Sequence, residues 1–558
     1  MTRRMRCVSW IVVGGLWACL PPDEEGEGAV GVSASMLVST CQPGALPEGE
    51  VNRVTVEVTG RDRNTGQSVL LASGEAAVPG DGVALGSVPA GSGRVVTVLG
   101  YRQGQDTPAW YGRKREVAIA QDRTTELQMV LSRFGASTCV GVPAGFSPMM
   151  FPASVVLGDG RVLVTGGFTT VEDQGGGSLR LTGPSDRAYL YDPFQGTFTE
   201  IASRMNAPRA GHVMVQLPLA QGDRVLIFGG LTKASWKAGT TFPLSFDTAD
   251  ALDSYEVFDV AAGTFVTGGE RMSSPRAFPE AGRLYDNSVL IVGGGRWPVD
   301  DARYLVADLW APYGGADGQG GLLALENGLR TNRQHNGGTM VKIEDTSQGL
   351  SRYLVLGGTT FDEAVLEVFT QSSRQQDGAS GAFRSRAVAN LPRLFFPGVA
   401  PIREDAQGNK RFLVAGGAVW NGSTLLPPGD QAWLLTIDGT GKGTVETLNG
   451  QPCAARWLHG VLASKDGDLA WLIGGVRDFG GGLADGACHL DLAAKRLVAA
   501  DASTGLLAGR FGAALEVLPD DTLWVAGGVG EAAELDPASA GKVEVYTPAA
   551  LKTSLVEM

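Results

Sequence analysis

The sequence predicts an all-β protein in which a small β-sandwich precedes a long array of similar repeats. Three observations support this prediction. Glycine and proline account for 80 and 28 of the 558 residues, as in chains with many turns, and no long amphipathic helical pattern is present. Short segments of period-two alternation fill the region before residue 140. Beyond it, seven apolar segments each end in two consecutive glycines.

The N-terminus carries the pattern of a signal peptide over residues 1–18, followed by a tether over 19–28. Three arginines precede the apolar segment Cys7–Trp17, which is shorter than the roughly 20 residues of a membrane span. The tetrapeptide Leu16–Cys19 resembles the lipobox of bacterial lipoproteins, which implies cleavage before Cys19 and lipidation of that cysteine. We therefore expect an exported protein, anchored by lipid to the cell envelope at the outer membrane or cell surface. The alternative is an ordinary secretory signal peptide that is cleaved nearby.

Cysteine usage is consistent with export. With Cys7 removed and Cys19 lipidated, an even number of cysteines remains, which permits two disulfides in an oxidising compartment. The pairing that keeps each bridge within one domain is Cys41–Cys139 and Cys453–Cys488. Four buried thiols are the alternative. No Cys-x-x-Cys occurs, which argues against a thiol redox site or a cysteine zinc site.

The module over 29–140 shows strand-like alternation, clearest in Val54–Val58. Further expected strands are separated by turn signals such as Pro79–Gly82. Six or seven short strands in about 105 residues are typical of a small β-sandwich. The segment Gly86–Gly91 with the strand after it resembles Ig-like or transthyretin-like modules of bacterial lipoproteins, which implies a spacer or adhesion role and no activity. The other expected strands are Val69–Leu71, Val83–Leu85, Arg94–Leu99, Arg115–Ala118 and Thr125–Leu131.

The repeats begin near Ser147, and their doublets are spaced 63, 64, 64, 59, 58 and 53 residues apart. Each unit has a first apolar strand, a second strand that ends in the doublet, a third strand such as Tyr255–Asp259, and a fourth strand with an aromatic residue. An arginine precedes six of the doublets by 17 to 24 residues. In the first unit, Phe151-Pro152 stands in its place. The doublets are Gly166-Gly167, Gly229-Gly230, Gly293-Gly294, Gly357-Gly358, Gly416-Gly417, Gly474-Gly475 and Gly527-Gly528, and the arginines are Arg209, Arg276, Arg333, Arg393, Arg456 and Arg510.

This combination resembles kelch repeats, which implies a seven-bladed kelch-like β-propeller over 147–558. Each blade would be a four-stranded sheet that packs on its neighbours, so that no blade is stable alone. An arginine that recurs once per blade is expected to serve the blade's own hydrogen bonding. We expect Leu551–Met558 to supply the final outer strand. The alternative is that the segment before Ser147 completes the last blade.

The connections that follow the doublets are the long ones, and binding sites concentrate on such loops. These loops contain aromatic residues that could form an exposed binding face for a protein or a glycan. The alternative is that the rings fold over the blades and bury themselves. The candidate binding residues are Trp236, Phe242, Trp297, Trp420 and Phe479.

Catalytic and nucleic-acid functions find little support in the sequence. A net charge of −13 offers no basic surface for phosphates. Some kelch propellers resemble galactose oxidase, a copper enzyme with tyrosine and histidine ligands. Of the four histidines, however, His212, His335 and His459 follow a repeat arginine and are expected to be structural. Nucleophile-elbow, zinc-protease and Walker motifs are missing. We therefore predict no catalytic residue, metal or cofactor.

The predicted function is a monomeric protein that binds an extracellular or envelope ligand, a protein or a glycan, without catalysis. The alternative is a propeller enzyme that acts on carbohydrate, of epimerase or hydrolase type. This alternative requires carboxylates that converge in the channel, and the sequence alone does not identify such a set. A copper oxidase of galactose-oxidase type is disfavoured.

Overall fold

The computed structural model of the chain describes residues 26–36, 51–61, 68–78, 83–220, 222–240, 243–294, 306–312, 320–323, 329–330, 337–358, 366–373, 380–386, 388–421, 424–480, 482–484, 486–499, 509–530 and 541–552. Strands dominate, joined by short 3-10 helices such as η2 (Thr248–Asp250) and η5 (Pro452–Ala454). The chain divides into two compact units, residues 1–35 with 49–131 and residues 36–48 with 132–558. In the part of the chain that the structure describes, no helix is long and apolar enough to cross a membrane.

The first unit is one antiparallel sheet of seven strands in the order β3-β2-β5-β6-β7-β1-β4. Alternate residues of its strand β2 are buried, as the alternation predicts. The edge strands β3 and β4 also contact each other, so the sheet curls back on itself where we expected two packed sheets. The strands are β1 (Glu27–Met36), β2 (Arg53–Arg61), β3 (Ser68–Ala77), β4 (Val83–Pro89), β5 (Gly91–Tyr101), β6 (Trp110–Ile119) and β7 (Thr124–Arg133).

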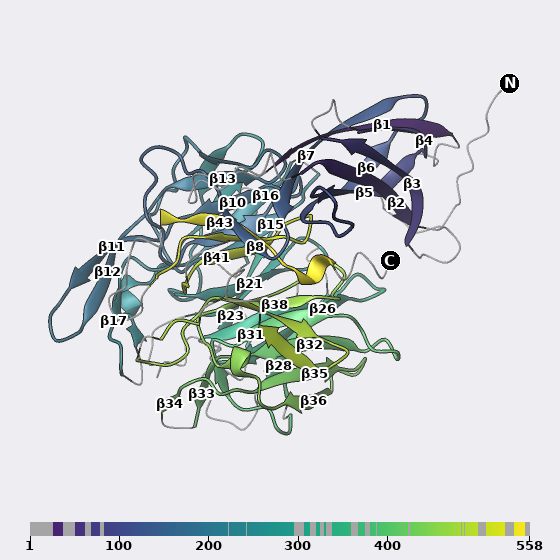
Figure 1. Ribbon diagram of the computed structural model, residues 1–558. Coiled ribbons are helices and arrows are strands. Elements are labelled where there is room, and N and C mark those ends of the chain that lie inside the picture. The colour runs from purple at the N-terminus through teal and green to yellow at the C-terminus, as the bar shows by residue number, and fades with distance from the viewer. Residues whose placement is uncertain are drawn as a thin grey trace. The chain divides into compact units, whose positions relative to one another are not determined.

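In the second unit, each of the seven doublets lies at the end of the second strand of a different antiparallel sheet, and we number these sheets as repeats 1 to 7. Figure 1 labels many of their strands. Repeats 1 to 3 contain β9 (Ala153–Val156), β10 (Val162–Thr165), β13 (Ala188–Asp192) and β14 (Thr197–Glu200); β15 (Val213–Leu217), β16 (Arg224–Phe228), β19 (Tyr255–Asp259) and β20 (Thr264–Thr267); and β21 (Pro279–Arg283), β22 (Val289–Gly293), β23 (Val306–Ala311), β24 (Gly321–Leu322) and β25 (Leu329–Arg330).

Repeats 4 to 7 follow the same order of first, second, third and fourth strand. They contain β26 (Gly338–Asp345), β27 (Ser351–Gly357), β28 (Leu366–Ser373) and β29 (Ser380–Arg386); β31 (Gly398–Ile402), β32 (Lys410–Ala415), β35 (Ala432–Ile437) and β36 (Gly443–Leu448); β37 (Gly460–Ala463), β38 (Ala470–Ile473), β39 (Ala487–Asp491) and β40 (Arg496–Ala499); and β41 (Ala514–Val517), β42 (Leu523–Ala526), β43 (Val543–Thr547) and β8 (Ala136–Cys139).

The core of the second unit lies between neighbouring repeats. The second strands β10, β22, β27, β38 and β42 are buried along their whole length, because both faces of each sheet are covered. Leu163 of repeat 1, for example, shares one apolar cluster with Val225 and Ile227 of repeat 2. A sheet buried on two faces by its neighbours explains why the same apolar segment recurs in every repeat.

The last repeat is completed from the N-terminal side of the array. Strand β8 pairs with β43, with Cys139 opposite Glu544 and Ala136 opposite Thr547. The expectation that Leu551–Met558 supplies this outer strand is wrong, and the alternative is right. Leu551 and Lys552 lie in a helical turn, and residues 553–558 lie outside the described residues. The free edge of β43 thus receives a strand from a distant part of the chain, which closes the sheet.

The first strands of the repeats surround a central channel. They contact one another in the closed order β9, β15, β21, β26, β31, β37, β41 and again β9. Residues of β9, β37 and β41 are mostly half-buried although many are aliphatic. Side chains from the first strands of repeats 1, 2, 3, 6 and 7 line a cavity in this channel.

Connections after the doublets, together with the connection between repeats 4 and 5 that contains β30, form two additional sheets. One has the order β11-β12-β17-β18 and joins the connections of repeats 1 and 2, and the other has the order β30-β33-β34. Figure 1 shows β11, β12 and β17 together. The strands are β11 (Phe168–Asp173), β12 (Leu179–Pro184), β17 (Ala234–Trp236), β18 (Leu244–Ser245), β30 (Leu394–Phe395), β33 (Ala418–Trp420) and β34 (Leu425–Leu426).

Candidate functional site: the central channel

The repeat arginines are structural, as their recurrence predicts. In four repeats the guanidinium is buried and donates a hydrogen bond of 2.6 to 3.1 Å to the carbonyl of the first doublet glycine. In repeats 2, 3 and 7 it also pairs with a buried third-strand carboxylate. In repeat 6 the sulfur of Cys488 lies 3.4 Å from Arg456 instead. The three ion pairs are Arg209–Glu256, Arg276–Asp308 and Arg510–Glu544.

In two repeats, uncharged side chains replace both the arginine and the third-strand carboxylate of this ion pair. The second doublet glycine donates its N–H to the carbonyl of the next repeat's arginine, as Gly230 does to Arg276. By this contact, the counterparts of the arginine are Met149 in repeat 1, which accepts from Gly528, and Leu394 in repeat 5, which accepts from Gly358.

The predicted occupants of the arginine position in these two repeats are therefore wrong. Phe151-Pro152 begins two residues after the true position in repeat 1, and Arg393 lies one residue before it in repeat 5. The register places Tyr189 and Trp433 where other repeats have the carboxylate. The arginine and its acid are thus lost together. Arg333 lies outside the described residues.

A ring of main-chain contacts surrounds one end of the channel. Phe151, Phe278, Phe396 and Leu458 have φ between 50° and 56°, a conformation that bulky L-residues rarely adopt. Glycines take the corresponding place in repeats 2, 4 and 7. Five of the seven successive pairs of members are joined by an N–H to carbonyl hydrogen bond in the described residues, and the bond from Phe151 to Gly512 links the first repeat to the last. Because every member belongs to a different repeat, the ring requires the whole array.

A continuous apolar cluster covers this end of the channel. It contains Phe151 and Phe511 of the channel wall, together with Leu181 and Trp236 from the additional sheet. The rings of Phe151 and Phe278 meet edge to face at 5.5 Å. The cluster therefore packs the channel wall against the long connections.

The candidate aromatic binding residues do not form an exposed face where the structure describes them. Trp236 is 1% exposed and stacks on Trp457 at 6.1 Å, and Phe479 is 8% exposed. Trp420 is half-buried against the same cluster. The expectation of exposed rings is wrong for Trp236 and Phe479, because burial in the cluster removes their apolar area from water. Phe242 and Trp297 lie outside the described residues.

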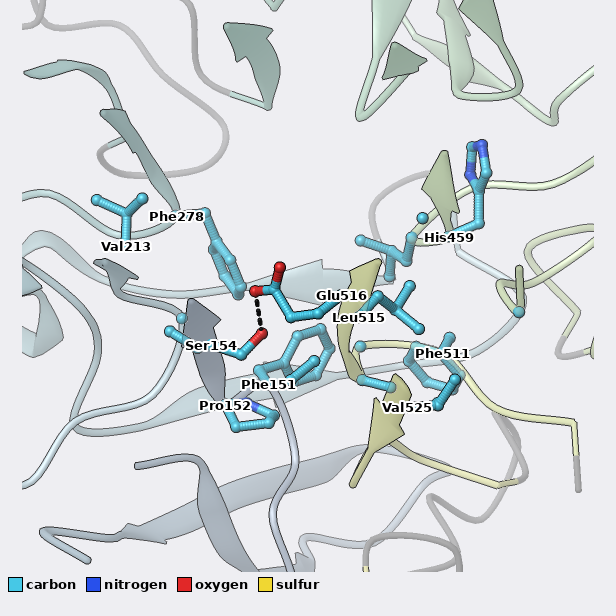
Figure 2. Close-up of a pocket in the computed structure, with 18 of the residues that line it drawn as sticks. Phe151, Pro152, Ser154, Val213, Phe278, His459, Phe511, Leu515, Glu516 and Val525 are labelled. Carbon is cyan, nitrogen blue, oxygen red and sulfur yellow. Dashed lines mark hydrogen bonds between the residues drawn. The ribbon is translucent and has the colours of Figure 1, made fainter. Parts of the chain in front are cut away.

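Inside the ring, a cavity of about 410 Å³ occupies the channel. Its wall is mainly apolar, but Ser154, Glu280 and Glu516 contribute polar groups from three different first strands. The Ser154 hydroxyl donates to the Glu516 carboxylate over 2.7 Å, and Figure 2 shows the two side chains turned toward each other. The N–H of Met340 donates to Glu280 over 3.3 Å.

The two carboxyl groups differ from ordinary glutamates. Burial raises the pKa of Glu516 to about 7, although the bond from Ser154 opposes the shift. Burial raises the pKa of Glu280 to about 8, partly opposed by the N–H of Met340. Desolvation disfavours the charged form of a carboxyl group. At neutral pH, Glu280 is therefore mostly protonated and Glu516 is divided between its two forms.

Neither Glu280 nor Glu516 is among the site residues predicted from the sequence. The available signal was a charged residue within an otherwise apolar first strand, as in Leu515-Glu516-Val517. Such a residue must face either the channel or the core between repeats, and only the register decides which.

The channel histidines are neutral and held by the repeats. His212 shares a 2.7 Å hydrogen bond with the hydroxyl of Thr165, and His459 bonds through Nε2 to the carbonyl of Ala415 at 3.1 Å. Burial lowers the pKa of His212 well below its usual range and that of His459 to about 3. His335 lies outside the described residues.

The residues do not fit a copper site of the galactose-oxidase kind. The described lining of the cavity contains neither tyrosine nor cysteine. No group of three or more histidine, cysteine or acidic side chains among the described residues could hold a metal ion. We therefore derive no chemistry through copper.

One predicted cysteine pair is present as a disulfide, Cys453–Cys488, with a Cα–Cα distance of 6.3 Å. Cys139 is also disulfide-bonded. Cys41 and Cys19 lie outside the described residues, so the bridge between Cys41 and Cys139 and the lipidation of Cys19 stay predictions.

Comparison with known proteins yields similarity at the level of structure. No family model and no curated protein matches the sequence. A fungal alcohol oxidase of the AA5 family, solved in complex with copper, has a TM-score of 0.50 and 13% identity over 75% of this chain and 76% of its own. YjhT has a TM-score of 0.34 and 12% identity over 72% of this chain and 93% of its own.

These findings correct the prediction of a non-catalytic binding protein and the prediction that the chain is not an enzyme. The first structural relative is an oxidase, and the carboxyl groups that the enzyme alternative required do line the channel cavity. At 13% identity the likeness establishes the architecture alone, and that architecture is a kelch-type β-propeller.

Proposed function

We propose that the chain is a propeller enzyme that carries out proton-transfer chemistry on a small carbohydrate in the channel cavity. The observation that carries the proposal is Glu516, whose carboxyl group lines the cavity, is held by Ser154 and has a pKa of about 7. A group with a pKa near the working pH can both give and take a proton, which is the requirement for general acid–base catalysis.

Glu280 would complement Glu516. With its pKa raised to about 8, its carboxyl group is mostly protonated at neutral pH and can donate a proton or a hydrogen bond. Two carboxyl groups whose surroundings give them different pKa values can divide the roles of acid and base. Ser154 would position Glu516 through its hydroxyl.

The cavity has a suitable size for such a substrate. Its volume of about 410 Å³ lies within the range of small-molecule sites, about 300 to 1,000 Å³. A mainly apolar wall with a few polar groups is also typical of these sites. The hydroxyl groups of a sugar could bond to the carboxyl groups and Ser154, while its C–H faces meet the phenylalanine rings.

The test is turnover of a panel of mono- and disaccharides, followed by NMR for epimerisation or hydrolysis. Glu516→Gln keeps the shape of the side chain but cannot transfer a proton, and should lower kcat by about 100-fold or more. Glu280→Gln should alter the basic limb of the pH profile. The control is Glu446→Gln, an exposed acid that pairs with Lys495. Full turnover by Glu516→Gln would overturn the proposal.

We further propose that the enzyme works outside the cytoplasm, anchored through Cys19. The signal-peptide pattern and the disulfide Cys453–Cys488 support this location, since disulfides persist in oxidising compartments. Cys19→Ser should abolish metabolic labelling with palmitate in a bacterial host. Continued labelling of this variant would refute the anchor.

A further inference from the structure

We propose that the ligand of the channel cavity carries a positive charge on a small ring, as a protonated amino sugar does. This inference rests on the proposed function for its premise that the cavity is the substrate site. Beyond the proposed function, it states that the substrate is positively charged.

No cation in the described cavity wall is available to balance the channel carboxyl groups when they ionise. The titratable groups that line the described cavity are His212, Glu280, His459, Arg510 and Glu516. The two histidines are neutral at pH 7, because burial lowers the pKa of each. Arg510 forms a buried ion pair with Glu544, so its charge is already compensated. The carboxyl groups of Glu280 and Glu516 are the remaining ionisable groups.

Within the described residues, no lysine or arginine forms an ion pair with either carboxyl group. Glu516 accepts from the hydroxyl of Ser154, and Glu280 accepts from the N–H of Met340. Both donors are neutral. Two buried carboxylates elsewhere in the same unit do have a cationic partner, since Glu256 and Asp308 each form an ion pair with a buried arginine. A cationic ligand would supply the counter-charge that the channel carboxyl groups lack.

Aromatic rings in the same wall favour a cation further. Phe151, Phe278 and Phe396 line the cavity, and the pairs Phe151–Phe278 and Phe278–Phe396 meet at 5.5 and 5.9 Å. The faces of aromatic rings attract ammonium groups, and they also cover the apolar face of a ring-shaped ligand. Figure 2 shows Phe151 and Phe278 in the wall that also holds Glu516.

An anionic ligand is disfavoured by the same groups. It would bring a negative charge to two carboxyl groups without a free cation in the described wall, and like charges at short range repel. A cation has the opposite effect. It stabilises the ionised form of a carboxyl group, so binding near neutral pH should displace a proton from Glu516, whose pKa of about 7 leaves it partly protonated.

The experiment compares three sugars of the same ring by titration calorimetry on the intact protein at pH 7. Glucosamine is the cation, glucose the neutral reference and glucuronate the anion. We expect glucosamine to bind at least about tenfold more tightly than glucose, with glucuronate weakest. Titrations in two buffers of different ionisation enthalpy should show proton release with glucosamine. Equal affinities, or preference for glucuronate, would overturn the inference.

Variants assign the effect to the carboxyl groups. Glu280→Gln and Glu516→Gln should each reduce the preference for glucosamine over glucose, and the exposed control Glu446→Gln should retain it. An unchanged preference in both channel variants would overturn the inference. The comparison of the three sugars on the unaltered chain does not depend on how the variants fold.

The outcomes separate this inference from the proposed function. Turnover of neutral sugars without preference for an amine would contradict the inference and leave the enzyme proposal intact. Tight binding of glucosamine without turnover of any sugar in the panel would support the inference and count against the enzyme proposal.

Discussion

Arg276→Met should test whether the buried ion pairs of the repeats are needed for stability. Arg276 and Asp308 are 0% and 7% exposed at their side chains and lie 2.7 Å apart. Arg276 also donates to the carbonyls of Gly293 and Val306. Removal of the arginine leaves a buried carboxylate that keeps only hydrogen bonds such as those from Ser273. The expected loss is about 4 kcal/mol of unfolding free energy.

The double variant Arg276→Met with Asp308→Leu should be less destabilised than Arg276→Met alone, although it carries one more substitution. It resembles the apolar pairs Met149–Tyr189 and Leu394–Trp433, which the chain already contains at this place. Replacement of a complete buried pair by apolar residues avoids the unpaired charge. We expect the double variant to recover about 2 kcal/mol.

The assay is urea unfolding followed by tryptophan fluorescence, with midpoints converted at a common slope. Arg271→Met is the matched control, because Arg271 is 67% exposed and pairs with Asp253 at the surface. Its cost should stay below about 1 kcal/mol. The reasoning would be refuted if Arg276→Met cost no more unfolding free energy than the control Arg271→Met. It would also be refuted if the loss in the double variant equalled the sum of the losses in Arg276→Met and Asp308→Leu.

Three further predictions concern the channel and the disulfide. The pKa of Glu516 in the folded chain, about 7, exceeds the ordinary value of 4.5. Its contribution to stability is therefore fully present below pH 4.5 and is lost as the pH rises through 7. Glu516→Gln should remove this decline of up to about 3 kcal/mol, visible in thermal midpoints at pH 5 and pH 8; an equal decline in the variant would contradict it. Gly512→Ala should destabilise by about 2 kcal/mol, since φ is +61° and the new Cβ would lie 2.6 Å from Phe151. Gly541→Ala, with no atom within 4 Å, is the control for the same urea assay, and equal midpoints would disprove the clash. Reduction of Cys453–Cys488, or its replacement by serines, should cost about 3 to 4 kcal/mol for a separation of 35 residues; thermal midpoints that do not respond to a reductant would argue against this.

Much of the fold could be predicted because it is encoded locally. A second strand buried on both faces must be apolar throughout, and the doublets have positive φ, as at Gly166 and Gly167, which glycine adopts without strain. Both features recur in each repeat and are therefore visible in one sequence. The structural role of Arg209, Arg276, Arg456 and Arg510 could be predicted for the same reason.

The site was harder to predict because its residues do not recur. Glu280 is specific to repeat 3 and Glu516 to repeat 7, since the other repeats have different residues at the matching strand positions. The two side chains line one cavity only when the array closes. The sequence left open whether Trp236 is exposed or buried, because a position in a loop does not reveal burial. Its ring is covered by Trp457 and Phe511, more than 200 residues away in the chain.

The sequence by itself determined the strands, the repeat unit and the structural role of its arginine, because these depend on contacts within one repeat or with an identical neighbour. Only the tertiary structure decided that β8 closes the last repeat, that the loop aromatics cover one end of the channel, and that two glutamates face its cavity. The physical reason is that these features depend on contacts between distant segments. The free energy of these contacts comes from closure of the ring and from removal of side chains from water, and neither can be predicted from a local sequence pattern.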